Sequence, residues 1–394
     1  MRSLLLFAGI LVLFTSEILR VYFIMPMPGS QQSNTIDMAY LIAKNIWWLR
    51  LIGLALFTIP AITIFRNGLK WKRFGLILVC MAYVAVVYMF NFVMEADKMF
   101  YQPKHTHFAS YAENTIDSNK LVLGVSLNGI AKAYPIQLIG YHHQVVDSID
   151  NTPVIVTYCT VCRTGRVFSP EVNGKTEQFR LVGMDHFNAM FEDATTKSWW
   201  QQATGRAITG KLKGTSLKEI PSQQVSIAAW NRMYPATLIM QPDSSFKEKY
   251  KKMDSYDKGL SKSSLTRRDS GSWQAKSWVV GISIQNEAKA FDWNQLVKNS
   301  LIEDSLPGIP FIITLEKDTA SFHAWNRTIN GTILHFTKNN TPGYITDTQT
   351  GSVWNEDGKC IAGSLTGQQL KPIQAYQEFW HSWQTFHPET KKIK

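Results

Sequence analysis

The stretch Gly124-Val-Ser-Leu-Asn-Gly-Ile-Ala-Lys-Ala-Tyr134 recurs 157 residues later as Gly281-Ile-Ser-Ile-Gln-Asn-Glu-Ala-Lys-Ala-Phe291. In the first copy, Asn128-Gly129 separates two short apolar runs, and this dipeptide favours the two-residue turn of a β-hairpin. The recurrence of so many identical or similar residues predicts that the hairpin, and the unit around it, is written twice.

Further matches continue in the same order along the chain. They pair Pro153 with Pro310, Asp193 with Asp347, Trp200 with Trp354, Trp230 with Trp383, and Pro235 with Pro388. Short β-branched runs bounded by turn residues indicate strands, and only a few short segments indicate helices. We therefore expect an α+β, strand-dominated domain built from two tandem repeats with pseudo-twofold symmetry, and we assign the shared tryptophans to its core.

Three apolar runs precede this domain, at residues 4–25, 46–65 and 74–94. Each is close to the roughly 20 residues that a helix needs to cross a bilayer. Glu17 and Arg20 interrupt the first run, and a cleaved signal peptide could explain that run but not all three. We expect residues 1–95 to form a membrane anchor of about three transmembrane helices, with the lipid bilayer as their partner.

The basic residues predict which way the anchor faces. Arg66, Lys70, Lys72 and Arg73 lie between the second and third runs, whereas residues 26–37 hold no basic residue. Because cytoplasmic loops are enriched in Lys and Arg, three crossings place everything after about Glu95 outside the cytoplasm. In a Gram-negative cell this predicts an inner-membrane protein with a periplasmic C-terminal domain, where disulfides can form.

The rest of the chain divides into three ranges. Residues 96–240 form the expected first repeat, which bears a Cys-x-x-Cys pair, and residues 278–394 the second, which lacks it. Residues 241–277 are rich in Lys, Ser and Asp and read as a polar linker or surface excursion. The net charge of +11 comes from scattered lysines. It indicates a basic surface beside anionic lipid rather than nucleic-acid binding.

The duplication separates residues kept for folding from residues that differ between copies. Cys159 and Cys162 follow a buried-type strand, and the second copy has Glu316 and Thr319 in their places. Two thiols at this spacing can form a disulfide or bind copper or zinc. Arg163 follows directly, and a neighbouring cation is expected to lower a thiol pKa. A helix start, as in thioredoxin-like proteins, is not expected here because Thr164-Gly165 follows.

Three of the histidines in the same copy as the cysteines are candidate metal ligands. His142 and His143 fall opposite Asn299 and Ser300, and His186 lies in a loop. Histidine and thiolate ligands, with Met184 nearby, suit a soft ion such as Cu(I). Asp185 could orient a metal-binding histidine by accepting a hydrogen bond from its other ring nitrogen. Surface or core histidines are the alternative explanation.

The segments Pro153-Val-Ile-Val-Thr-Tyr-Cys-Thr-Val-Cys162 and Asp193-Ala-Thr-Thr-Lys-Ser-Trp-Trp200 carry a resemblance to a known family. They resemble the bacterial and archaeal domain of unknown function 3179, over roughly residues 121–373. The family's usual Pro-Leu between the cysteines is Thr160-Val161 here, and a usual acidic residue is replaced by His143. The resemblance implies the fold and the position of the site, but no reaction.

Three functions remain open from the sequence. The first is a Cys/His site for a transition metal, most readily copper. The second is thiol–disulfide exchange at Cys159 and Cys162. The third is a non-enzymatic scaffold or accessory subunit of a membrane complex, in which the pair is a structural disulfide. No Ser-His-Asp set, phosphate loop or paired-carboxylate pattern names a catalytic reaction.

Overall fold

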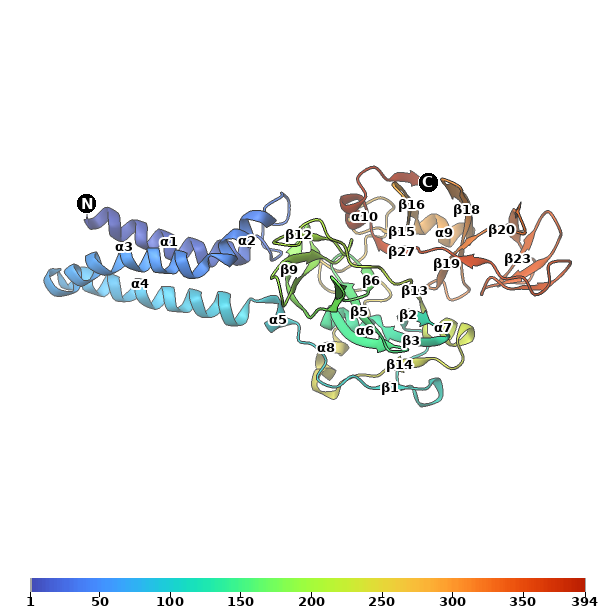
Figure 1. Cartoon of the computed structure of the whole chain (residues 1–394), viewed down its shortest axis with the longest axis horizontal. Helices are drawn as coiled ribbons and strands as arrows, with labels where there is room; N and C mark the ends of the chain where they lie inside the picture. Colours follow the sequence, from blue (N-terminus) through green and yellow to red (C-terminus); the bar gives the residue numbers. More distant parts are fainter. Residues whose placement is uncertain (1, 394) are drawn as a thin grey trace. The chain divides into compact units, whose positions relative to one another are not determined.

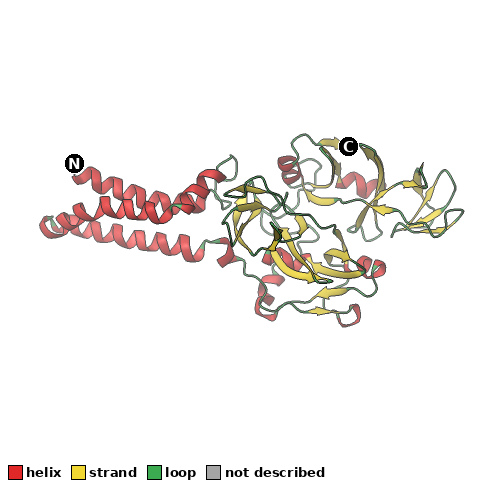
Figure 2. Ribbon diagram, viewed as in Figure 1, coloured by secondary structure: helices red, strands yellow, loops and turns green. Residues whose placement is uncertain are grey.

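The structure, a computed structural model, describes residues 2–393 and divides into two compact units (Figure 1). One unit combines the chain up to Tyr101 with Glu177–Gln201 and Arg206–Ser216. The other combines Gln102–Thr176, Gln202–Gly205 and Leu217–Lys394. The first unit therefore joins the N-terminal helices to a small piece of the strand-rich chain, and the second holds the remaining strands (Figure 2).

Three helices in the first unit are long and apolar enough to cross a membrane. They are α1 (Arg2–Tyr22), α3 (Ile46–Asn67) and α4 (Lys70–Tyr88), which continues as the π-helical turn η1 (Met89–Val93). The three predicted apolar helices are thus present. α1 packs closely on α3, since a Cβ on Gly9 would lie 2.7 Å from the Phe57 nitrogen. Small residues allow such close approach between membrane helices.

The charged residues that interrupt the first apolar run pair with one another inside the helix bundle. Glu17, fully buried, accepts hydrogen bonds from Arg50 at 2.6 Å and from Asn91 at 3.0 Å. Arg20 donates to Asn91 at 2.7 Å and to Glu95 at 3.1 Å. Charged groups inside a membrane helix bundle are expensive unless paired, and this network supplies the pairing.

The same unit contains two short helices and a four-stranded antiparallel sheet. The helices are α2 (Ile36–Lys44) and α5 (Ala96–Met99). The sheet has the order β12-β11-β10-β9 and is formed by β9 (Phe179–Asp185), β10 (Asn188–Asp193), β11 (Trp199–Gln201) and β12 (Ala207–Thr209). It is attached to the chain that leaves α1, because the Met184 amide donates to the Ile24 carbonyl at 2.7 Å.

The second unit begins with a five-stranded sheet of order β1-β14-β3-β2-β13. Its strands are β1 (Phe108–Ala109), β2 (Leu121–Leu127), β3 (Ile130–Pro135), β13 (Gln223–Ser226) and β14 (Leu238–Met240). The predicted hairpin of β2 and β3 is confirmed: Asn128 and Gly129 at its turn have φ of 51° and 85°. Such positive φ values at both positions are those of a type I′ turn.

A three-stranded antiparallel sheet follows in the chain and carries the cysteine pair. It contains β4 (Gln144–Ile149), β5 (Thr152–Cys159) and β6 (Thr164–Phe168). The helix α6 (Ile136–His142) leads into β4, and α7 (Ile227–Met233) follows β13. A short hairpin of β7 (Glu171–Val172) and β8 (Lys175–Thr176) follows β6.

The C-terminal part of this unit contains three further four-stranded sheets. One has the order β27-β15-β16-β28, from β15 (Trp278–Ile284), β16 (Glu287–Asp292), β27 (Tyr376–Phe379) and β28 (Lys391–Ile393). The second joins β17 (Leu301–Leu306), β18 (Ile309–Leu315), β19 (Phe322–Asn326) and β26 (Lys371–Pro372). The third joins β22 (Phe336–Lys338), β23 (Tyr344–Asp347), β24 (Val353–Asn355) and β25 (Cys360–Ala362).

The remaining elements are short. The helices α9 (Trp293–Asn299) and α10 (Trp380–Phe386) follow β16 and β27, and β20 (Thr328–Ile329) pairs with β21 (Thr332–Ile333). Residues 241–277 hold the turn η3 (Ser244–Phe246) and the helix α8 (Lys247–Lys251). This segment is not wholly solvated, since Phe246, Tyr250 and Tyr256 are buried.

The bundle network gives a first test. The variant Glu17→Met leaves the Arg50 guanidinium without its carboxylate, and removing one partner of a buried ion pair costs about 3–5 kcal/mol. We expect a lower melting temperature in detergent, largely restored in the double variant Glu17→Met, Arg50→Met. Arg66→Met, at the exposed end of α3, is the control. Melting of Glu17→Met at the control's temperature would contradict a stabilising role for the network.

Candidate functional site

The cysteine pair lies in the tight connection between β5 and β6. Cys159 ends β5 and pairs with Thr164 of β6, so Cys162 falls within the turn that joins them. Both side chains are fully buried, and neither forms a disulfide. They interact directly, because hydrogen bonding with Cys159 contributes to raising the pKa of the Cys162 thiol. The predicted thiol pair is therefore one local unit on a β-turn, without a helix after it.

Two distant segments of the chain close over this turn. The Phe379 amide donates to the Cys162 carbonyl at 3.0 Å. The Lys276 ammonium donates to the Val161 carbonyl at 2.5 Å and lies 3.1 Å from Nε2 of His381. That Nε2 is itself 3.2 Å from the Val161 carbonyl oxygen. The thiol pair thus shares its surroundings with an ammonium and an imidazole from beyond the first repeat.

Burial controls the protonation of these groups. Burial raises the pKa of the Cys162 thiol well above its usual value, and hydrogen bonding with Cys159 raises it further. Burial lowers the pKa of Lys276, against the opposing attraction of Cys162 and Cys159. Burial and the Lys276 charge together lower the pKa of His381 to about 4. Negative charge on Cys162 is favoured by its hydrogen bond with Ser382 and then by the charge of Lys276, both of which act to lower the pKa of the thiol.

Arg163 does not act on the thiols as the sequence suggested. Its guanidinium lies 4.0 Å from the centre of the Trp278 ring and its Nε donates to Gln377 at 2.8 Å. The residue has a left-handed φ of 56°, which turns the chain after Cys162. The expectation that Arg163 lowers a thiol pKa is wrong for Cys162, because burial raises that pKa instead. Arg163 serves as a buried anchor for the turn.

A buried ion pair holds the strand after the turn. Arg166 of β6 donates to Glu378 at 2.5 Å, and both side chains are almost completely buried. Its guanidinium also lies 3.5 Å from the centre of the Tyr376 ring. Glu378 accepts from Ser382 at 2.9 Å, and hydrogen bonding with Ser382 acts to lower the pKa of Cys162. The ion pair thereby positions Ser382 beside the thiols.

His142 and His143, predicted as candidate ligands, form hydrogen bonds to tyrosines of the same unit. Nε2 of His142 lies 2.6 Å from the Tyr250 hydroxyl, and Nδ1 of His143 lies 3.2 Å from the Tyr141 carbonyl. Both side chains are buried. His143 ends α6 with a left-handed φ of 63°, and burial lowers its pKa to about 4.

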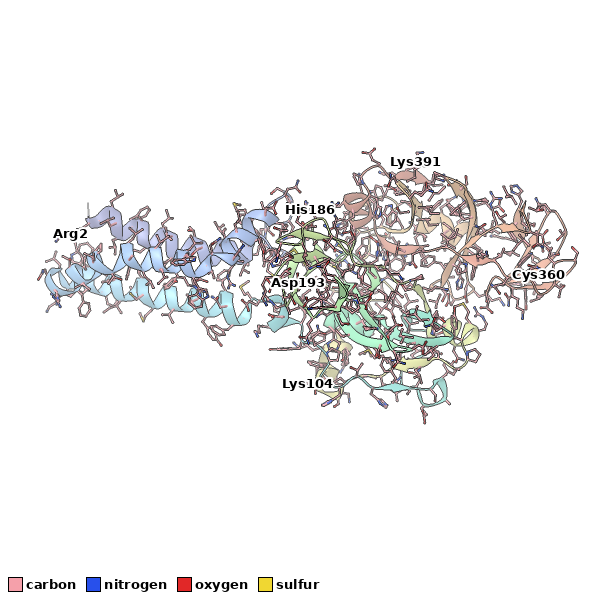
Figure 3. All side chains as sticks on the ribbon, in the orientation of Figure 1. Arg2, Lys104, His186, Asp193, Cys360 and Lys391 are labelled. Atoms are coloured by element: carbon pink, nitrogen blue, oxygen red, sulfur yellow. The ribbon has the colours of Figure 1, made fainter. Side chains whose placement is uncertain are left out.

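His186, Asp185 and Met184 lie in the unit that contains the three long helices. His186 is labelled in Figure 3. His186 occupies the turn between β9 and β10, where its Nδ1 lies 2.6 Å from Asp185. This hydrogen bond raises the pKa of His186. Asp185 also accepts from Gln201 at 2.5 Å, so its carboxylate joins the two side chains. The Met184 side chain is buried.

The described residues, 2–393, contain no group of three or more His, Cys, Asp or Glu side chains placed to hold a metal ion. A site made by the two cysteines and a predicted histidine is therefore not assembled in this structure. Two thiols alone remain sufficient for an ion that accepts two sulfur ligands.

Sequence reasoning missed Lys276, His381 and Ser382. Lys276 lies in the segment interpreted as a polar linker, where a lysine gives no signal of burial. His381 and Ser382 lie at the start of α10, next to a tryptophan that the repeat assigned to the core. His381 and Ser382 could have been found by comparing the two copies, because the first copy has alanines at the aligned positions 228 and 229.

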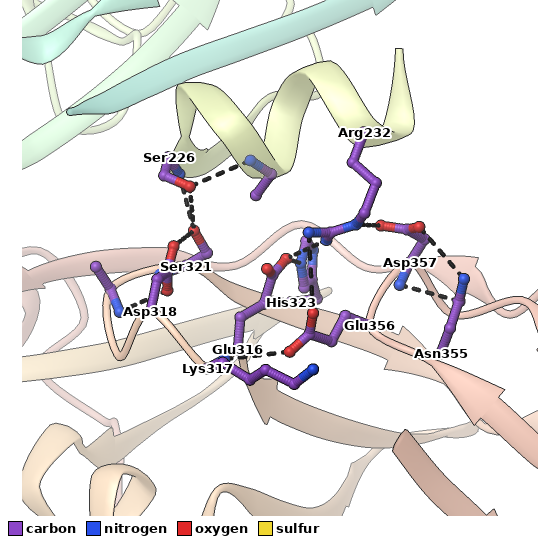
Figure 4. A network of polar contacts seen from close by, with 12 residues as sticks. Ser226, Arg232, Glu316, Lys317, Asp318, Ser321, His323, Asn355, Glu356 and Asp357 are labelled. Atoms are coloured by element: carbon purple, nitrogen blue, oxygen red, sulfur yellow. Dashed lines mark hydrogen bonds and ion pairs between the residues drawn. The ribbon is translucent and has the colours of Figure 1, made fainter. Parts of the chain in front are cut away.

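The position aligned with Cys159 also carries polar chemistry, shown in Figure 4. Glu316 accepts from Arg232 at 2.8 Å and lies 2.6 Å from Nε2 of His323. Arg232 reaches Asp357 at 2.8 Å as well. These hydrogen bonds and charges lower the pKa of Glu316 against the opposing effect of burial. Glu316 also lines a cavity of about 360 Å³. At the aligned positions, the carboxylate of Glu316 thus replaces the thiol of Cys159, and the imidazole of His323 replaces the guanidinium of Arg166.

These features define a class: a strand-rich domain with a buried Cys-x-x-Cys turn, preceded by helices suited to a membrane. The chain belongs to the family described as "Protein of unknown function (DUF3179)", which matches residues 101–390. The predicted membership is confirmed. Neither a curated protein nor a solved structure matches the chain.

His143 predicts a pH dependence of stability. The unfolded imidazole takes up a proton below about pH 6.5, whereas the buried one does so only below about 4. The neutral form of His143 therefore stabilises the fold above about pH 6.5. This contribution is lost as the pH falls from about 6.5 to about 4. We expect His143→Asn to reduce the slope of the unfolding free energy by about 1.4 kcal/mol per pH unit there.

Asn is the chosen replacement because it tolerates the left-handed conformation. Denaturant titrations at pH 7, 6 and 5 measure the slope. The control is His335→Asn, whose side chain is 57% exposed. An unchanged slope in His143→Asn, with the native fold retained, would show that the imidazole titrates normally in the protein.

Proposed function

We propose that this protein binds Cu(I) through the Cys159 and Cys162 thiolates, on the extracytoplasmic side of a membrane. The carrying observation is the partly buried Lys276 ammonium, which donates to the carbonyl of Val161, between the two cysteines, at 2.5 Å. Its interactions with both cysteines favour negative charge at the sulfurs. Thiolate ligands select soft ions such as Cu(I).

Charge balance favours this ion. Cu(I) with two thiolates carries a single negative charge, and a buried charge is costly unless another charge pairs with it. Lys276 supplies one positive charge at the site. Zinc, the other ion considered, usually takes four ligands in a structural site. The described residues offer the two sulfurs without a third acidic, histidine or cysteine ligand placed with them.

Thiol redox is the second candidate, and the direct contact of the two thiols favours it. In such a step Cys159 and Cys162 lose two protons and two electrons to a partner disulfide, which is reduced to two thiols. The complete burial of both sulfurs weighs against it, because a partner sulfur has to reach one of them. The third possibility, a scaffold or subunit of a membrane complex with a structural disulfide, has no separate observation in its favour.

The proposed location is the inner membrane, with the domain in the periplasm. The start of α1 and the junction of α3 with α4 lie at the same end of the helix bundle (Figure 1). The basic residues of this junction lie in the helix ends, with Arg66 in α3 and Lys70, Lys72 and Arg73 in α4. The opposite ends of α1 and α3 lead toward α2 and the sheet of β9–β12. The positive-inside rule then supports a cytoplasmic basic end and an extracytoplasmic domain.

The tandem repeat with pseudo-twofold symmetry is part of the same proposal. Trp230 donates to Thr237 at 2.8 Å, and Trp383 donates to Thr390 at 2.9 Å. A Cβ on Gly124 would lie 2.4 Å from the Trp230 ring. The aligned residues Gly281 and Trp383 are packed equally closely, since a Cβ on Gly281 would lie 2.3 Å from the Trp383 ring.

Other aligned polar contacts support the repeat. Trp200 donates to Asp193 at 2.9 Å and Trp354 donates to Asp347 at 3.0 Å. Lys132 pairs with Asp147 at 2.8 Å, as Lys289 pairs with Asp304 at 2.7 Å. Contacts that recur at aligned positions are expected when one ancestral unit has been copied.

The copper proposal is tested on the full-length protein in detergent. After reduction, anaerobic titration with Cu(I) against a chromophoric chelator gives stoichiometry and affinity. We expect one tight Cu(I) per chain, lost in Cys159→Ser, Cys162→Ser and kept in the control Cys360→Ser. Lys276→Gln should bind about 10–100-fold more weakly, as do sites that lose a supporting residue.

Equal copper binding by the native protein and the double serine variant would refute the proposal. Thiol labelling then separates the remaining candidates. A pair that cycles between dithiol and disulfide with a partner supports redox exchange. A pair that stays oxidised under all conditions supports a structural disulfide.

The repeat proposal is tested by paired substitutions. Gly124→Ala and Gly281→Ala each force a Cβ into a tryptophan ring, and overpacking of this kind costs about 1–3 kcal/mol. Gly75→Ala is the control, because no other part of the chain lies within 4 Å of the Cβ that this substitution adds. Denaturant midpoints should fall for both glycine variants. A loss at only one of them would contradict equivalent roles.

A further inference from the structure

A large cavity lies within the unit that holds the three long helices. None of the residues that line it belongs to the cysteine site. The cavity has a volume of about 950 Å³ and is bounded by the end of α1, by α2 and by the sheet of β9–β12. Every residue that lines it belongs to this one unit. The cavity is therefore independent of the copper proposal.

The cavity wall is apolar and aromatic on one side. Val21 and Ile24 come from the end of α1, and Leu41 comes from α2. Tyr40 packs edge-on against Trp199 of β11, with ring centres 5.2 Å apart. Aromatic side chains with a polar edge are typical of the membrane–water boundary.

Most charges that line the cavity are neutralised in pairs. Arg20 pairs with Glu95 at 3.1 Å, and Lys213 pairs with Asp37 at 2.8 Å. Arg180 pairs with Glu192 at 2.9 Å. These pairs use all three acidic residues of the lining.

Three lysines of the lining are left over. Lys44, Lys197 and Lys211 are exposed and form no ion pair among the described residues. They come from α2, from the β10–β11 turn and from the segment after β12, so separate elements bring them to one cavity. The lining therefore carries an excess of three positive charges beside an apolar wall.

The helix boundaries place this cavity at the surface of the membrane. α1 ends at Tyr22 and α3 begins at Ile46, and the cavity is lined by residues just before and after these boundaries. Phospholipid head groups occupy this level, above the apolar core that the helices span. Anionic head groups attract lysines placed there.

We propose that the cavity binds the head group of an anionic phospholipid from the surrounding membrane. Lys44, Lys197 and Lys211 contact the phosphate, and the wall of Val21, Ile24 and Leu41 receives the start of the acyl chains. The bound lipid would fix the β9–β12 sheet at the membrane surface.

The test uses the full-length protein in a neutral detergent and measures lipid retention by native mass spectrometry. The probes are phosphatidylglycerol, phosphatidylcholine with the same chains, and glycerol phosphate. The variant Lys44→Gln, Lys197→Gln, Lys211→Gln is compared with Lys298→Gln, Lys359→Gln, Lys371→Gln, which removes the same charge from the other unit. Melting temperatures verify that both variants fold.

We expect the native protein and the control variant to retain phosphatidylglycerol in preference to phosphatidylcholine. Each lysine near a membrane surface contributes roughly fivefold, so the cavity variant should bind on the order of 100-fold more weakly. Equal weakening in both triple variants would show general charge attraction and overturn the proposal. Glycerol phosphate binding as tightly as the lipid would assign the cavity to a soluble anion instead, and also overturn it.

Discussion

The ion pair between Arg166 and Glu378 is shut off from solvent, and the surroundings of the thiols depend on it. Arg166 belongs to the strand that follows the Cys-x-x-Cys turn, and Glu378 belongs to β27, 212 residues later. A buried charge without its partner is strongly destabilising, so each residue requires the other. The pair fixes β27 against β6, and the Phe379 amide can then reach the Cys162 carbonyl.

This constraint explains why the thiol site is shared by distant parts of the chain. The turn itself provides only Cys159 and Cys162. The ammonium and imidazole beside them, Lys276 and His381, come with the segments that the ion pair and the Phe379 contact hold in place. The surroundings exclude water from the sulfurs and leave one cation to favour negative charge there. The thiol site is thus a property of the whole unit.

Sequence patterns predicted the local elements well and the long-range contacts poorly. The three apolar helices, the Asn128-Gly129 hairpin and the strand before Cys159 follow from local composition and turn chemistry. The pairing of Glu17 with Arg50 could not be read from either run alone, because it depends on how α1 packs on α3. Lys276 and His381 were missed for the same reason. Their pKa values are lowered by burial against distant parts of the chain, and the residues next to them in the sequence do not indicate that burial.

The distance along the chain between the two sides of the thiol site has a consequence for biogenesis. His381 contacts the Val161 carbonyl across 220 residues, so the turn stays open until almost the whole polypeptide has been made. Until those segments have been made, the turn lacks the cover that β27 and α10 give to the sulfurs. Once α10 docks, both sulfurs are buried, so a metal ion or a reagent reaches them in the finished protein only when this cover opens. The rate at which the pair can react is therefore set by segments more than 200 residues away along the chain.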